Sequence, residues 1–297
     1  MNKVIVIVGP TGVGKTKLSI ALAKLNNGEI INADSTQVYK GMDIATAKVT
    51  EEEKENIPHH LLDIKDITED YTVYDYQRDC RLIIDDILAR GKTPILVGGT
   101  GLYIKATLFN YDFKEEQDVT MDYSNLSNDE LYEKLLIVDP NTSIHKNNRK
   151  RVERALAYYE INHEPFSSKE TSTKKMYDFL VIGLTTDREI LYNRINYRVD
   201  NMVNIGLIDE AKKIYESQIR SKAVLTPIGY KELFPYFDGT IPLSDCLDKI
   251  KQNSRKYAKR QYTWFNHQLD VKWFDVDFDN FTNTVNAVEE YIKNVKN

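Results

Sequence analysis

The chain has 297 residues, of which 41% are apolar and 29% are charged, and its formal net charge at pH 7 is −5. This composition excludes a disordered or collagen-like chain and is typical of a globular protein. The longest apolar run, residues 4–8, is too short to span a membrane, and the N-terminus carries no signal-peptide pattern, so we expect a cytoplasmic protein without a membrane partner. The two cysteines lie far apart and exclude a disulfide framework or a structural zinc finger.

Apolar periodicity predicts alternating strands and helices in the N-terminal part of the chain. The expected strands are 3–8, 29–32 and 93–97, and the expected helices are 15–25 and 74–89. Nearer the C-terminus, the pattern predicts a buried strand at 178–184 and long helices at 188–215 and 244–265. Strands that alternate with helices predict the α/β class, with a parallel sheet flanked by helices.

The middle of the chain differs from the rest. From about residue 114 the strand signal fades, and helical stretches at 129–138 and 148–159 alternate with polar loops. This change predicts a helical insertion domain at 113–177 within a core formed by 1–112 and 178–297.

Residues 9–16, GPTGVGKT, match the phosphate-loop pattern G-x-x-x-x-G-K-[ST] between an expected strand and an expected helix. Glycines let backbone N–H groups turn toward phosphate oxygens, and the helix N-terminus adds positive potential. A chance match is the alternative, but the flanking elements disfavour it. The loop therefore predicts a diphosphate ligand, with Thr16 holding Mg²⁺ and with these binding residues: Gly9, Pro10, Thr11, Gly12, Val13, Gly14, Lys15 and Thr16.

The acidic residue that usually accompanies such a loop is in an unusual place. An ATPase has a metal-binding Asp at the end of a second core strand, but the expected strand at 93–97 runs into Gly98-Gly99-Thr100. This disfavours an ordinary ATPase or GTPase. Asp34 instead follows the strand at 29–32, at the edge where open α/β sheets bind ligands. From its position alone, Asp34 could equally be a helix cap or a turn residue.

Three segments in this order resemble the signature of the tRNA dimethylallyltransferases: GPTGVGKT (9–16), DSTQVYKGMDIATAK (34–48) and LVGGTGLYIKA (96–106). Further similarity lies at 58–64, 194–211, 227–232 and 255–265, so the resemblance spans most of the chain. The departures are local, namely Ala45 where the family usually has glycine and Thr226-Pro227 where alanine is common. The series of motifs is highly specific for this family and is similar to its bacterial members.

The resemblance implies a P-loop NTPase-like core, a helical insertion that helps to clasp the anticodon stem-loop, and a channel in which two substrates meet from opposite ends. It implies prenyl transfer from dimethylallyl diphosphate to N6 of adenosine 37, in tRNAs that read codons beginning with U. The products would be N6-dimethylallyladenosine and diphosphate. The implied partners are tRNA and dimethylallyl diphosphate, and no obligatory protein partner is expected.

Roles for single residues follow from this chemistry and from the resemblance. The exocyclic amine of adenine is a poor nucleophile, and Asp34, ionised at pH 7, is the predicted base that takes its proton. The resemblance implies that Thr11 and Thr100 donate hydrogen bonds near the reacting phosphate and amine. It also implies that an arginine reaches the diphosphate, for which Arg198 is the first candidate and Arg194 the second. The alternative for both arginines is a solvated helix face.

Contacts with tRNA are expected at the flipped base and along two basic clusters. Ser35 and Gln37 carry groups able to read the edge of adenine. The alternative for the basic residues is that they are surface charges that solubilise the helices. The predicted tRNA-binding residues are Asp34, Ser35, Thr36, Gln37, Lys150, Arg151, Arg154, Arg255, Lys256, Lys259 and Arg260.

Three other functions remain open from the residues themselves. A prenyltransferase acting on free adenine nucleotides is the nearest, since it would share the phosphate loop and the segment around Asp34. A small-molecule kinase with a phosphate loop is disfavoured by Gly98-Gly99-Thr100. A non-catalytic RNA-binding protein is disfavoured because Lys15, Thr16 and Asp34 are intact.

Overall fold

The structure is a computed structural model that describes residues 3–111, 122–168 and 174–296. The chain forms two compact units, of which one comprises Met1–Phe109 with Lys175–Asn297 and the other comprises Asn110–Lys174. The sequence-based division at 112–113 and 177–178 stays a prediction, and its first boundary lies outside the described residues. Within the described ranges, no helix has the length and hydropathy needed to cross a bilayer.

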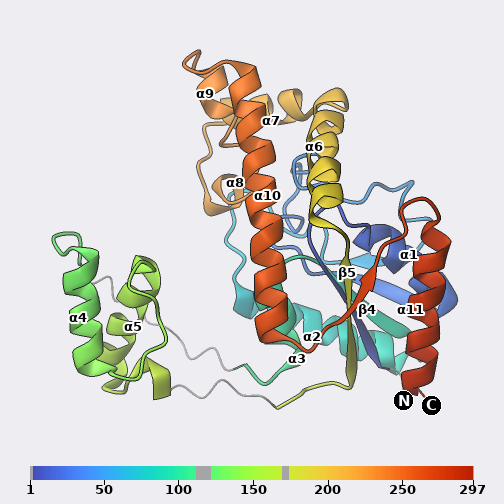
Figure 1. Ribbon diagram of the computed structural model, residues 1–297, viewed down its shortest axis with the longest axis horizontal. Coiled ribbons are helices and arrows are strands. Elements are labelled where there is room, and N and C mark those ends of the chain that lie inside the picture. The colour runs from blue at the N-terminus through green and yellow to red at the C-terminus, as the bar shows by residue number, and fades with distance from the viewer. Residues whose placement is uncertain (1–2, 112–121, 169–173, 297) are drawn as a thin grey trace. The chain divides into compact units, whose positions relative to one another are not determined.

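The larger unit is built on a six-stranded sheet in the order β3-β2-β4-β1-β5-β6, and every neighbouring pair is parallel (Figure 1). All five residues of β1 are buried, as expected for a central strand that is covered on both faces. The expected α/β class with a parallel sheet is confirmed. The strands are β1 (Val4–Val8), β2 (Gly28–Asn32), β3 (His59–His60), β4 (Thr93–Val97), β5 (Phe179–Thr185) and β6 (Lys272–Asp275).

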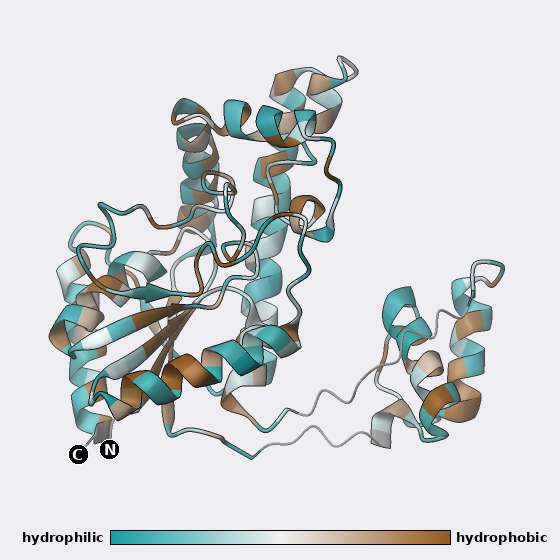
Figure 2. Ribbon diagram, turned by 180° about the vertical axis from the view of Figure 1, so that it is seen from behind, coloured by the Kyte–Doolittle hydropathy of each residue, from teal (hydrophilic) through white to brown (hydrophobic). Residues whose placement is uncertain are grey.

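Helices cover both faces of this sheet. On one face α1 contacts β1, β2 and β4 as well as α11, and on the other α2 contacts β2, β4 and α3. The central strands are coloured as apolar in Figure 2, because both faces pack against helices. The helices of this unit are α1 (Lys15–Leu25), α2 (Val73–Ala89), α3 (Gly101–Leu108), α6 (Arg188–Asn204), α7 (Leu207–Glu216), α8 (Lys222–Leu225), α9 (Phe234–Phe237), α10 (Leu243–Gln268) and α11 (Phe281–Lys296).

One helix and two strands differ from the sequence-based expectation. The single helix expected at 188–215 is wrong, because the chain breaks into α6 and α7 where Gly206 adopts a left-handed backbone with φ 108°. The edge strands β3 and β6 were not expected, since they are only two and four residues long and lack a clear apolar alternation.

The smaller unit is helical in its described residues, 122–168. It contains α4 (Asn128–Val138), α5 (Arg149–Asn162) and the short 3₁₀ helix η1 (Phe166–Ser168). Apolar side chains such as Leu131 and Leu135 of α4 form its own small core with Val152 and Leu156 of α5. Ser127 and Glu130 form a reciprocal capping box that starts α4.

Candidate functional site

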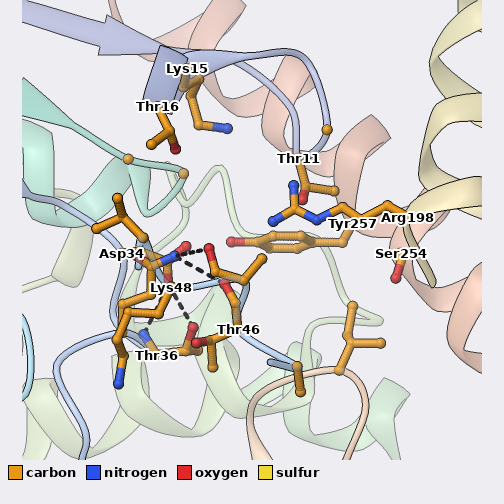
Figure 3. Close-up of a pocket in the computed structure, with 18 of the residues that line it drawn as sticks. Thr11, Lys15, Thr16, Asp34, Thr36, Thr46, Lys48, Arg198, Ser254 and Tyr257 are labelled. Carbon is orange, nitrogen blue, oxygen red and sulfur yellow. Dashed lines mark hydrogen bonds between the residues drawn. The ribbon is translucent and has the colours of Figure 1, made fainter. Parts of the chain in front are cut away.

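A cavity of about 1630 Å³ lies at the carboxyl ends of β1, β2 and β4 in the larger unit. The segments that follow these three strands line it, together with α6 and α10. In Figure 3, Lys15 and Thr16 lie on one side of this space and Asp34 on another, while Arg198 and Tyr257 reach toward the middle. The fold therefore brings the phosphate loop, Asp34 and Thr100 to one cavity, as parallel strands that end at a common edge require.

The phosphate loop, residues 9–16, has the backbone that its glycines permit. Gly9, Gly12 and Gly14 have φ values of 141°, 81° and 104°, which disfavour any residue with a Cβ. A Cβ on Gly14 would also lie 2.9 Å from the Phe281 ring. The loop leads directly into α1, so the positive end of this helix faces the same side as the loop.

Lys15 is held inside the loop that it belongs to. Its Nζ donates to the carbonyl oxygens of Gly9 at 2.9 Å and Pro10 at 2.8 Å. Burial and the nearby Arg198 guanidinium lower the pKa of Lys15 to about 7, while the Asp34 carboxylate acts in the opposite direction. An anionic ligand in the loop would favour the charged form of Lys15, because its negative charge would attract the ammonium group.

Asp34 is held by the residue at the end of β2. The Asn32 side chain accepts from Asp34 N at 3.0 Å and donates to Asp34 O at 3.1 Å. Asp34 Oδ1 accepts from the backbone N–H of Thr36 at 2.9 Å and from its hydroxyl at 2.7 Å. Among the described residues no hydrogen bond to Oδ2 is found. Asp34 is thus a turn residue and also a cavity-lining carboxylate with one oxygen available to a proton.

Thr100 joins the segment after β4 to the segment that contains Asp34. Its Oγ1 accepts from Ser35 N at 3.0 Å and donates to Ser35 Oγ at 3.2 Å. The backbone N–H of Thr100 donates to Ala33 O at 3.1 Å. Gly98 permits this approach, since a Cβ there would lie 2.1 Å from Ala33 O. Thr100 therefore lies against the neighbours of Asp34.

Gln37 contacts the loop at residues 43–47, which lines the cavity and which we name the rim loop. Its Nε2 donates to the carbonyl oxygens of Thr46 at 2.9 Å and Ala47 at 3.3 Å. The side-chain amide of Gln37, which was expected to contact adenine, thus donates to protein backbone in this structure.

Glu210 of α7 holds the other end of the rim loop. Its carboxylate accepts from the backbone N–H groups of Asp43, Ile44 and Ala45 at 2.8–3.1 Å and from the Tyr230 hydroxyl at 2.7 Å. Sequence reasoning missed this role of Glu210 and Tyr230, although both lie in segments that carry the family resemblance.

The two candidate arginines of α6 have different surroundings. Arg198 is half-buried at the cavity, where burial lowers its pKa and the carboxylates of Asp34 and Glu53 oppose that shift. Arg194 is exposed, donates from Nε to Gly12 O at 3.3 Å, and stacks 3.8 Å from the Phe278 ring centre. Both line the cavity, so neither lies on a purely solvated helix face.

One face of α10 contributes residues that sequence reasoning did not select. Gln261 is buried and bonds both to Thr11 N and to Gly99 O, at 3.1 and 3.2 Å. Tyr257 lines the cavity, and burial with the Asp34 carboxylate raises the pKa of its hydroxyl. Trp264 packs against Gly101, where a Cβ would lie 2.1 Å from the indole ring.

The basic residues expected to bind tRNA lie in both units. On α10, Lys256 and Lys259 are exposed, Arg260 stacks 5.5 Å from the Tyr257 ring, and Arg255 bonds to Asn196. In the smaller unit, Lys150, Arg151 and Arg154 of α5 are exposed.

The described residues offer few metal ligands. No group of three His, Cys, Asp or Glu side chains suited to a metal is found among them. Thr16 is exposed at the first turn of α1 and lines the cavity. One hydroxyl beside a phosphate loop is a donor set that fits Mg²⁺ bound mainly through phosphate oxygens and water.

Residues 37–268 match the family model described as IPP transferase. The chain belongs to this family. The tRNA dimethylallyltransferase of Anoxybacillus flavithermus is 50% identical, over 98% of this chain and 96% of the relative. That of Bacillus subtilis is 48% identical, over 92% of this chain and 90% of the relative.

Solved structures of IPP transferases share this fold. The tRNA delta(2)-isopentenylpyrophosphate transferase of Staphylococcus epidermidis is 42% identical, with a TM-score of 0.75 and coverage of 99% of both chains. A eukaryotic dimethylallyltransferase acting on tRNA is 33% identical, with a TM-score of 0.84, over 99% of this chain and 80% of that chain. The expected P-loop NTPase-like fold and the family resemblance are confirmed. The alternative of a free-nucleotide prenyltransferase finds no support in these comparisons.

Proposed function

We propose that this IPP transferase moves the dimethylallyl group from dimethylallyl diphosphate to N6 of adenosine 37, in tRNAs that read codons beginning with U. The bond from C1 of the prenyl group to the diphosphate oxygen breaks, the bond from N6 to C1 forms, and the N6 proton passes to a base. The observation that carries this proposal is that one cavity contains both a phosphate loop and the carboxylate of Asp34, whose Oδ2 accepts no hydrogen bond from the residues that the structure describes.

At the donor end, positive charge gathers where the leaving group would lie. Lys15, Arg198 and the N–H groups of the phosphate loop surround the same part of the cavity. Such groups stabilise the negative charge that develops on the departing oxygens. Mg²⁺, held through Thr16 and the diphosphate itself, would neutralise further charge there. Thr11 belongs to the loop and would donate its hydroxyl to the reacting phosphate.

At the acceptor end, Asp34 would take the N6 proton as attack proceeds. The adenosine must leave its stack to reach this cavity, as base-modifying enzymes generally require. Ser35, Thr36 and Gln37 follow Asp34 in the cavity wall, and Thr100 packs on this segment. In this role Gln37 would contact the base through its carbonyl oxygen or act by holding the rim loop.

The exposed basic residues would bind the tRNA backbone. On α10 these are Lys256, Lys259 and Arg260, with the half-buried Arg255 beside them, and in the smaller unit they are Lys150, Arg151 and Arg154. We propose that the smaller unit clasps the anticodon stem-loop. Because the proposed substrate is tRNA, we expect the protein to act in the cytoplasm.

The test is transfer of radiolabelled dimethylallyl from its diphosphate, with Mg²⁺, to an unmodified anticodon stem-loop that carries A37. Parallel reactions offer AMP, ATP and a stem-loop with G37. Label on the A37 stem-loop alone is the expected result. Label on AMP or ATP would favour a free-nucleotide prenyltransferase, and no label on any acceptor would refute prenyl transfer to adenine.

A further inference from the structure

Gln261 of α10 bonds to both walls of the cavity at once. Its Oε1 accepts from Thr11 N in the phosphate loop at 3.1 Å, and its Nε2 donates to Gly99 O in the segment after β4 at 3.2 Å. Only 5% of the residue is exposed. A buried amide whose donor and acceptor both bond to backbone holds its partners at a defined separation, because breaking either bond leaves a buried polar group unpaired.

The glycines of the segment after β4 match this arrangement. A Cβ on Gly99 would lie 2.1 Å from Gln261 Nε2, and a Cβ on Gly101 would lie 2.1 Å from the Trp264 ring. Gln261 and Trp264 are three residues apart on one face of α10, so the helix meets both glycines with neighbouring side chains. The glycines thus allow α10 to approach the backbone closely enough for the two bonds of Gln261.

From Gly99 the contacts continue to the residue expected to act as base. Thr100 follows Gly99 and bonds through its hydroxyl to Ser35, which is next to Asp34. The donor side of the cavity is therefore linked to the acceptor side through Gln261. Both sides follow strands of one sheet, and Gln261, from a distant part of the chain, bonds to the phosphate loop and to the segment after β4.

We propose that Gln261 is a positioning residue that sets the separation of the phosphate loop and the Asp34 segment, and with it the approach of N6 to C1 of the prenyl group. The inference rests on the proposed function. Gln261 acts through the loops rather than on the substrates, so its loss should lower the rate of the chemical step more than it weakens the binding of either substrate. A misplacement of about 1 Å can reduce a rate about 100-fold.

The experiment compares Gln261→Met, which keeps the size of the side chain and removes both bonds, with Gln261→Glu, which keeps only an acceptor for Thr11 N. The matched control is Gln252→Met, an exposed position on the same helix. We expect Gln261→Met to lower kcat by about 30- to 100-fold, with both KM values changed less than about threefold. The control should behave as wild type.

A second measurement reports directly on the hydrogen bond between Thr11 N and Gln261. The backbone amide of Thr11 should exchange its hydrogen faster in Gln261→Met than in wild type or in the control, because its acceptor is gone. Wild-type kcat in Gln261→Met, or a loss that lies wholly in KM, would overturn the proposal. If Gln261→Met does not fold, the kinetic criteria alone apply to Gln261→Glu, for which we expect a smaller loss of kcat and wild-type exchange of the Thr11 amide, since its acceptor is kept.

The two proposals fail in different ways. If the wild-type protein labels no stem-loop, the proposed function fails and the positioning role in that reaction falls with it. If wild type labels the stem-loop but Gln261→Met matches it in kcat and in Thr11 amide exchange, only the role of Gln261 is refuted.

Discussion

Asp34 combines two properties at the level of a single side chain. One carboxylate oxygen closes a turn with Thr36, and the other has no hydrogen-bond partner among the described residues. The turn fixes the direction of the carboxylate, and the second oxygen can accept a proton. A residue that looks like an ordinary turn residue in the sequence can therefore also serve as a base.

We expect Asp34→Ala to lower the single-turnover rate of prenyl transfer by about 100- to 10,000-fold, the range that general-base catalysis contributes. Affinity for the stem-loop should change less than about threefold, because the phosphate contacts remain. Rapid-quench kinetics and a binding titration measure the two quantities. Asp209→Ala, at an exposed position of α7, is the control. A single-turnover rate near that of wild type would remove Asp34 from the role of base.

Lys15 predicts a dependence of donor binding on pH. Its pKa is lowered to about 7, so in the free protein Lys15 loses its charge as the pH rises through that value. Only the charged form attracts diphosphate, so KM for dimethylallyl diphosphate should rise above pH 7, by up to about tenfold per pH unit. Lys15→Met should bind weakly at every pH, without this dependence.

The charge on Lys15 affects folding stability and donor binding in opposite directions: it weakens the folded state and strengthens the binding of the diphosphate. Because the folded-state pKa of Lys15 lies below its ordinary value, this group destabilises the folded protein at and below about pH 7, and the effect fades as the pH rises toward 10.5.

Lys17→Met, on the same helix, is the control for donor binding and should keep the wild-type dependence of KM on pH. A KM that is constant from about pH 6 to pH 9 would contradict the prediction.

At the scale of secondary-structure elements, the buried carboxylate of Glu29 connects β2 to β3 and to the segment between α2 and β4. Glu29 of β2 has a side chain that is only 4% exposed, and it pairs with His60 of β3 at 2.8 Å, with Arg90 after α2 and with Lys92 at 2.7 Å. Hydrogen bonds from Arg90, Lys92 and His60 hold the pKa of Glu29 well below its usual range, although burial opposes them.

We expect Glu29→Gln to lower the free energy of unfolding at pH 7 by about 2 kcal/mol, within the range for hydrogen bonds to charged groups. Partial exposure of Arg90 and Lys92 keeps the loss moderate. Because the folded-state pKa is lowered, the wild-type advantage should be full above about pH 4.5 and shrink as the pH falls below it. Denaturant melts at several pH values, with Glu290→Gln as an exposed control, measure this. A difference that stays constant down to pH 3 would refute it.

The exposed lysines of α10 predict how the affinity for tRNA depends on salt concentration. Lys256 and Lys259 are exposed on the helix that also carries Gln261. If they contact tRNA phosphates, replacing both with Ala should reduce the slope of log affinity against log salt by about 1 to 2. Lys272 and Lys293, exposed on β6 and α11, are the matched control pair. An unchanged salt slope would show that the lysines of α10 do not contact phosphate.

At the scale of the whole molecule, the two units have separate cores. The ends of the larger unit, Phe109 and Lys175, pair through an antiparallel bridge. A short Gly/Ser turn can therefore replace residues 110–174 without straining the sheet.

We expect this deletion variant to keep its fold and to bind inorganic diphosphate within about threefold of wild type. Its affinity for the stem-loop should fall at least about tenfold, since several phosphate contacts would be lost. Calorimetry with each ligand measures both. The full chain with Lys150, Arg151 and Arg154 replaced by Ala is the control for charge. Unchanged stem-loop affinity in the deletion variant would refute a clasping role for the smaller unit.

Much of this protein could be predicted from short stretches of sequence. The strands β1, β4 and β5, the helix α1 and the phosphate loop were all expected, because neighbouring residues carry their signals: buried apolar runs, helical spacing and glycines that need a left-handed backbone. Asp34 was predicted from its place after a strand of a parallel sheet together with the motif around it, and Thr100 from the family resemblance. These features are local, and sequence alone determined them. The catalytic roles of Asp34 and Thr100 stay predictions.

Tertiary structure decided what depends on contacts between distant segments. The bonds of Gln261 to Thr11 and Gly99, and the hold of Glu210 on the rim loop, join residues more than 150 positions apart, and no local pattern distinguishes these side chains from ordinary polar helix residues. The lowered pKa of Lys15 likewise requires Arg198 of α6 to come beside it. The sequence determined which chemical groups are present, and packing decided which of them touch, because burial and distance arise only when the chain is folded.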